Sequence, residues 1–135
     1  MDLYLALKQR FEENRDAENA VKMSAYMRDQ FCYYGLATPK RRALYRDILK
    51  DAKKAGRIDW DLLDRCYEDE YREFQYLVMD YLANMQKYLT YDDVPKIFKY
   101  IKQSDYPFES ARGVATIATI IRSNRPAPKF RLLNL

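Results

Sequence analysis

The chain has 135 residues, of which 24 are Lys or Arg, 20 are Asp or Glu and none is His, so its formal net charge is +4. Aromatic residues make up 15% of the chain while Gly and Pro are scarce, which favours a helix-rich globular fold over a β-sandwich or a disordered chain. The absence of His excludes Ser–His and Cys–His catalytic pairs. No apolar run approaches the roughly 20 residues that span a bilayer, and the N-terminus lacks the basic region of a signal peptide, so the sequence predicts a cytoplasmic protein.

The two cysteines, Cys32 and Cys66, are far apart in the sequence, and both have apolar or aromatic neighbours. They lack the paired spacing of zinc ligands, so we expect no metal site and two buried thiols that act as small hydrophobic residues. Any acid–base chemistry must then use carboxylates, Tyr or Lys.

The first two helices are predicted by apolar residues at helical spacing. Residues 3–11 carry such a pattern, and the helix should end near Asn14. Asp16 is placed to cap a second helix, whose apolar positions recur over residues 20–31. Tyr26 has two interpretations: a core residue with its hydroxyl at the edge, or a residue of a binding surface.

A third helix is predicted from Pro39 to about Lys54. Gly35 suits a left-handed helix end, and Thr38 offers a side-chain oxygen to the first amides of the next helix. Pro39 fits the first helical position, where its missing N–H costs nothing, and Gly56 should end the helix.

Three cations, Lys40, Arg41 and Arg42, follow at the start of this helix, where positive charge opposes the helix dipole. The pattern is either a solvated basic first turn or a phosphate site made of helix amides and arginines. Arg46 lies one turn beyond Arg42 on the same face, so both could reach one phosphate strand.

The remaining helices continue the pattern. Asp59 should cap a short helix in which Trp60 is a core residue, and the longest periodic stretch covers residues 70–85. Arg72 and Glu73 begin that stretch on the opposite face, where a solvated or interhelical ion-pair role is expected. Thr90 or Asp92 opens a sixth helix that ends near Gln103. Six helices joined by short turns predict an all-α protein of antiparallel helix pairs.

Residues 104–135 differ in character. They hold four helix breakers and an apolar, β-branched stretch at residues 114–121, which is either a covering helix or a segment without a partner. No acid follows Glu109. The basic residues of this tail are Arg112, Arg122, Arg125, Lys129 and Arg131. We therefore expect two parts: a helical domain over residues 1–103 and a divergent basic tail over residues 104–135.

Two motifs of the sequence resemble a known family. The first comprises Met23, Tyr26, Met27, Arg28, Phe31, Gly35, Leu36, Thr38, Pro39, Arg41 and Arg42, and the second comprises Arg72–Gln75, Asp80–Leu82 and Lys87. In this order and spacing they resemble the bacterial DNA alkylation repair glycosylases built from HEAT-like helical repeats. The resemblance covers roughly residues 3–103, and it implies a short solenoid of antiparallel helix pairs.

The resemblance implies excision of N3- or N7-alkylated purines from duplex DNA by hydrolysis of the N-glycosidic bond, without a metal or cofactor. It also implies a set of residues that touch the DNA backbone or the lesion: Tyr26, Thr38, Pro39, Arg41, Arg42 and Arg46. The family's catalytic Trp and Asp, four residues apart, should follow Ser104. This sequence has Asp105-Tyr-Pro-Phe-Glu-Ser110 instead, so Tyr106 and Glu109 are the catalytic candidates.

Three hypotheses follow from this departure. The chain is a DNA alkylation repair protein that lacks the catalytic half, or it is a non-catalytic helical-repeat module that binds DNA or protein. The third is genetic: a truncated product whose reading frame changes near residues 103–110.

Overall fold

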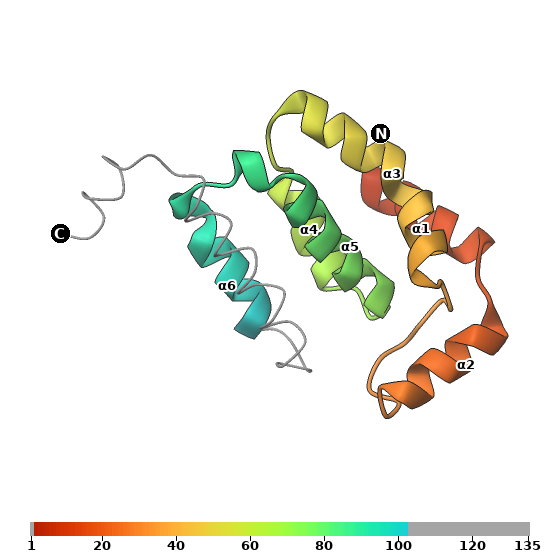
Figure 1. The fold of residues 1–135 in the computed structure, drawn as a ribbon. Helices are drawn as coiled ribbons and strands as arrows, with labels where there is room; N and C mark the ends of the chain where they lie inside the picture. Colours follow the sequence, from red (N-terminus) through yellow and green to blue (C-terminus); the bar gives the residue numbers. More distant parts are fainter. Residues whose placement is uncertain (1, 103–135) are drawn as a thin grey trace. The chain divides into compact units, whose positions relative to one another are not determined.

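The computed structural model describes residues 2–102. The regular elements of this part of the chain are all helices, as the sequence predicts (Figure 1). Its only β feature is an isolated bridge between Cys32 and Tyr71. The α-helices are α1 (Leu3–Glu13), α2 (Ala17–Tyr26), α3 (Thr38–Ala55), α4 (Trp60–Tyr67), α5 (Arg72–Asn84) and α6 (Val94–Lys102). None of the helices among residues 2–102 combines the length and apolar character needed to cross a membrane.

Three predicted helix signals are confirmed. The side chain of Asp16 accepts a hydrogen bond from the amide of Asn19, and Asp59 accepts one from Leu62 at 3.1 Å, so both aspartates cap their helices. Gly56 ends α3 in the left-handed conformation with φ of +72°. These signals could be predicted because a cap residue bonds to backbone groups only a few positions away in the sequence.

The predicted extent of α2 is wrong, because the helix ends at Tyr26 rather than near Phe31. Arg28 and Asp29 both adopt positive φ values, 57° and 58°, which breaks the helical path. Local hydrogen bonds hold this reversal: the amide of Asp29 donates to the carbonyl of Ser24 at 2.7 Å, and the Ser24 hydroxyl donates to the Asp29 carboxylate at 3.1 Å.

Gly35 has a positive φ of +92°, as expected, but it lies in the loop before α3 and does not cap α2. A Cβ at this position would stand 2.0 Å from the carbonyl oxygen of Asp16, so the backbone leaves no space for a side chain. The same close approach lets the amide of Asp16 donate to the carbonyl of Tyr34 at 2.9 Å. The start of α2 and the loop before α3 are therefore joined backbone to backbone.

The described residues fall into two units that divide after Tyr81. The core of the first unit is rich in rings, with Phe11 between Tyr34 and Phe74 at centroid distances of 5.7 and 4.9 Å. Cys66 is buried in this unit, whereas Cys32 is exposed, so the expected burial of both thiols is correct only for Cys66.

In the second unit α6 begins close to the predicted start of the sixth helix. A short 3-10 turn at Tyr91–Asp93 precedes it, and a reciprocal capping box between Thr90 and Asp93 closes that turn. The buried side chains of α6 include Ile97 and Tyr100. The predicted tail over residues 104–135 lies outside the described residues.

Candidate functional site

The loop before α3 is held in place by Glu73, in the first turn of α5. Its carboxylate accepts hydrogen bonds from the amides of Tyr34 (3.0 and 3.1 Å), Gly35 (3.0 Å) and Leu36 (3.2 Å). The amide of Arg72 donates to the carbonyl of Cys32 at 2.8 Å. Both Arg72 and Glu73 are buried, which excludes the solvated role, one of the two alternatives expected for them. The Glu73 side chain and the Arg72 amide therefore hold the segment from Cys32 to Leu36 that leads into α3.

α3 begins without a side-chain cap. Ala37 occupies the N-cap position, Thr38 is already helical and Pro39 follows it, so the predicted cap by Thr38 is wrong by one position. The first turn contains no acidic residue. Since no side chain caps these amides, the partial positive charge of the helix terminus is left to solvent or to a ligand.

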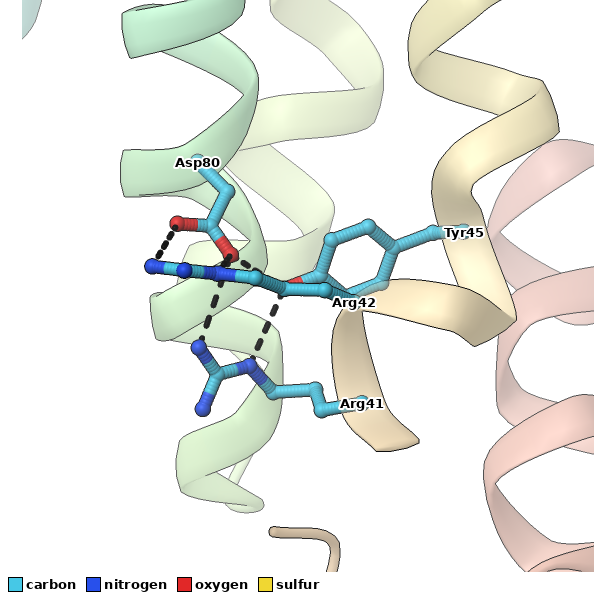
Figure 2. A network of polar contacts seen from close by, with 4 residues as sticks. All are labelled: Arg41, Arg42, Tyr45 and Asp80. Carbon is cyan, nitrogen blue, oxygen red and sulfur yellow. Dashed lines mark hydrogen bonds and ion pairs between the residues drawn. The ribbon is translucent and has the colours of Figure 1, made fainter. Parts of the chain in front are cut away.

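A four-residue network ties this helix start to α5 (Figure 2). The Asp80 carboxylate accepts a hydrogen bond from the Tyr45 hydroxyl at 2.5 Å and forms ion pairs with Arg41 at 3.5 Å and Arg42 at 3.3 Å. Arg41 also donates from Nε to the Tyr45 hydroxyl at 3.0 Å. Burial raises the pKa of Tyr45, so its phenol stays protonated and donates to Asp80.

The two arginines differ in exposure. The Arg41 side chain is only 7% exposed, and its guanidinium lies 4.8 Å from the ring centroid of Tyr76. The guanidinium of buried Arg72 lies 5.4 Å from the same ring and 4.3 Å from that of Phe31. These cations are thus placed on aromatic faces, which offset part of the cost of burying charge. Arg41 joins α3 to α5 and does not present its charge at the surface.

The Arg42 side chain, by contrast, is 58% exposed although it is paired with Asp80. The hydrogen bond to Asp80 raises the pKa of Arg42, so the side chain keeps its charge. Arg46 is exposed one turn further along the same face of α3, and Thr38 and Pro39 are exposed at its start. Tyr26 is 87% exposed at the end of α2, which excludes the core interpretation of this residue.

A cleft of about 620 Å³ lies at the other end of α3. It is lined by Trp60, which is half-buried, and by charged residues that include Asp51, Arg57 and Asp61. The carbonyl end of α3 and the excess of carboxylates make this cleft unsuited to a phosphate. None of the predicted site residues within residues 2–102 lines it, and no group of three or more His, Cys, Asp or Glu side chains in that range could hold a metal ion.

The structure thus brings Arg41 and Arg42 together through Asp80 and Tyr45, and it leaves Arg42 and Arg46 exposed on one helix face. Tyr106 and Glu109 lie outside the described residues. Asp80 was missed as a site residue, because an acid inside a long apolar stretch carries no local sign of a partner on another helix. The only signal for it was its place in the second family-like motif.

Taken together, these features define an all-helical protein in which the cationic N-terminus of α3 is held in place by hydrogen bonds and ion pairs from α5. A model of the DNA alkylation repair enzyme family matches residues 7–118, most of the chain. The chain therefore belongs to the DNA alkylation repair enzyme family. A comparison with curated proteins finds no significant match.

Among solved structures, the chain is similar to a protein from Enterococcus faecalis described as a predicted DNA alkylation repair enzyme. The two are 26% identical, with a TM-score of 0.67. The match covers 76% of this chain but only 48% of the other, so this chain spans about half the length of that relative.

Proposed function

We propose that the chain binds the phosphate backbone of double-stranded DNA through the surface at the start of α3, and that alkylated DNA is its substrate class. The observation that carries this proposal is the exposed Arg42 at an uncapped helix N-terminus, with Arg46 one turn away. Membership of the DNA alkylation repair family supports DNA as the ligand.

The electrostatics of α3 supports the same choice. Cations in the first turn of a helix each oppose the dipole by roughly 0.3–1 kcal/mol, a cost that a bound phosphate would remove. Asp80 neutralises one of the two paired arginines, so a net positive charge remains beside Arg42. Arginine suits this task because its planar guanidinium binds phosphate oxygens in a bidentate manner.

The finer chemistry is also a proposal. We propose that residues 1–103 form HEAT-like antiparallel helix pairs and that residues 104–135 form a separate basic tail. Glycosylases of this kind excise N3- or N7-alkylated purines, whose positive charge already makes the base a good leaving group. A carboxylate then has only to stabilise the cationic sugar and orient water. In this sequence Glu109 and Tyr106 would have to replace the family's Asp and Trp.

A second candidate function is a non-catalytic module that binds DNA or protein. The sequence of residues 104–110 favours it, because this segment contains no Trp and its only carboxylates do not match the family spacing. An assay for base release separates the two candidates, because a module that lacks the catalytic pair binds DNA without releasing 7-methylguanine.

The first experiment is a fluorescence-anisotropy titration of a DNA duplex at several salt concentrations, with the wild type and with Arg42→Ala/Arg46→Ala. The quantity to compare is the slope of the logarithm of the binding constant against the logarithm of the salt concentration. If both arginines contact phosphates, the magnitude of this slope should fall by about 2, since each phosphate contact contributes about 0.9. Arg41 is unsuitable for this test, because its side chain is buried and its removal would disturb the contact between α3 and α5.

Arg57→Ala is the matched control. It removes one positive charge, half of what the double variant removes, from an exposed residue just beyond the other end of α3, a helix about 27 Å long at 1.5 Å per residue. We expect its salt slope to equal that of the wild type. If Arg57→Ala weakens binding, in free energy, by half as much as the double variant, binding depends on net charge alone and the proposed surface is wrong.

A further inference from the structure

Asp80 binds Arg42 along one particular edge of the guanidinium. Nε of Arg42 lies 3.3 Å from Oδ2 of Asp80, and Nη2 lies 3.3 Å from Oδ1 (Figure 2). An arginine has five N–H donors, and this arrangement uses the side edge formed by Nε and Nη2. Nη1 and the outer N–H of Nη2 form the end edge. No residue among 2–102 accepts a hydrogen bond from Nη1 of Arg42.

Asp80 is itself held in place by two buried side chains. Its Oδ2 atom accepts the Tyr45 hydroxyl at 2.5 Å and the Nη2 group of Arg41 at 3.5 Å. The Asp80 side chain is 19% exposed, whereas those of Arg41 and Tyr45 are buried. The carboxylate is therefore fixed by buried groups, while the arginine that it orients is exposed.

We propose that Asp80 is a positioning residue for DNA binding: it holds the side edge of Arg42 so that the end edge of the guanidinium is presented to a phosphate of the DNA backbone. The inference rests on the proposed function of the α3 surface. A long, exposed arginine loses rotamer freedom when it binds a ligand, and Asp80 removes much of that freedom before the ligand arrives.

A carboxylate near a phosphate site also repels the ligand, so two effects of Asp80 have opposite signs. Repulsion predicts that Asp80→Asn tightens DNA binding, whether or not Arg42 is present. Positioning predicts that Asp80→Asn weakens binding only when Arg42 is present. These signs allow a double-mutant cycle to separate the two effects.

The test measures the dissociation constant for a DNA duplex with four proteins: wild type, Asp80→Asn, Arg42→Ala and the double variant. Asp80→Asn is expected to weaken binding about five-fold in the wild-type background, which corresponds to freeing one rotamer-rich side chain. In the Arg42→Ala background it should cause no weakening. Asp51→Asn removes the same charge from an exposed site on α3 and should leave the affinity within about 1.5-fold of wild type.

Equal weakening of both backgrounds would show that Asp80 acts through the fold, and tightening of both would show that it acts only as a charge. Either result overturns the inference. Tyr45→Phe provides a second cycle if Asp80→Asn does not fold, because it removes the hydroxyl that bonds Asp80 and keeps the ring and all charges. Like Asp80→Asn, Tyr45→Phe should weaken DNA binding, and it should do so only in the protein that retains Arg42.

The result for the wild type separates this inference from the proposed function. If the wild type shows no salt-dependent binding to DNA, the proposed function itself is wrong. If the wild type binds and loses affinity in Arg42→Ala, but neither cycle shows coupling, only the role of Asp80 is overturned.

Discussion

Replacing Glu73 by Gln should strongly destabilise the first unit, although the two side chains have the same shape. Oε2 of Glu73 accepts from the amides of Tyr34, Gly35 and Leu36, and Oε1 accepts from Tyr34 at 3.0 Å. In the glutamine variant, three charge-assisted bonds become neutral ones and lose about 1 kcal/mol each. The side-chain NH2 group would also face an amide donor. We therefore expect a loss of about 3 kcal/mol in the free energy of unfolding.

The assay is urea denaturation followed by the fluorescence of Trp60, the only Trp in the chain, which lies in α4. Hydrogen exchange adds a local readout, because the loop amides of Tyr34, Gly35 and Leu36 should lose protection before the amides of α3. The matched control is Glu70→Gln, an exposed site two residues before α5 begins, which should change stability by less than about 0.5 kcal/mol. Equal stabilities of Glu73→Gln and Glu70→Gln would refute the argument that these bonds hold the loop.

Three further predictions test other parts of the structure. Gly35→Ala should cost about 3 kcal/mol or more in thermal unfolding, because the new Cβ combines a positive φ with a clash against a backbone carbonyl. Burial raises the pKa of Cys66 to about 12, so iodoacetamide at neutral pH should label only the exposed Cys32 until denaturant is added, as read by peptide mass spectrometry. The hydrogen bond from Arg10 lowers the pKa of Asp47, so the stabilisation by this pair is present above the pKa of the unfolded carboxyl and is lost as the pH falls through that of the folded one. Asp47→Asn should therefore be less stable than wild type at neutral pH, by at most about 1 kcal/mol, and acid titrations of stability should show this difference disappear once the pH is below the pKa of the folded carboxyl.

The helix caps show which parts of the fold can be predicted from sequence. Asp16, Asp59 and Gly56 act on residues within four positions, so short patterns contain all the information needed. The end of α2 is different. It depends on two consecutive non-glycine residues with positive φ, Arg28 and Asp29. Asp is enriched at such positions, but Arg gives no sign of this conformation in the sequence.

The candidate site likewise has features that could be predicted from the sequence and features that could not. The exposure of Arg42 and Arg46 could be expected from the spacing of apolar residues on α3. The roles of Glu73 and Asp80 could not, because each meets partners more than thirty residues away in the chain. An acid in the first turn of a helix, such as Glu73, is ordinarily expected to face solvent and to interact favourably with the helix dipole. The sequence does not show that it binds the backbone of another segment instead.

The sparse packing of α2 has a consequence for how the chain would meet a partner. α2 has no fully buried side chain. Its ends are held mainly by hydrogen bonds, from the Asn19 side chain to the carbonyl of Gly35 at 2.8 Å and from the Ser24 hydroxyl to the carbonyl of Phe31 at 3.4 Å. If the buried Met27 stays in place, opening the last turn of α2 at Tyr26 would therefore expose almost no additional apolar area and should be among the least costly local openings of the first unit. Because it exposes so little surface, the free energy of this opening should depend only weakly on denaturant concentration. It should be visible instead as fast hydrogen exchange of the amides in the last turn of α2. The ring of Tyr26 can thus adjust its position on a partner surface without any change in the core.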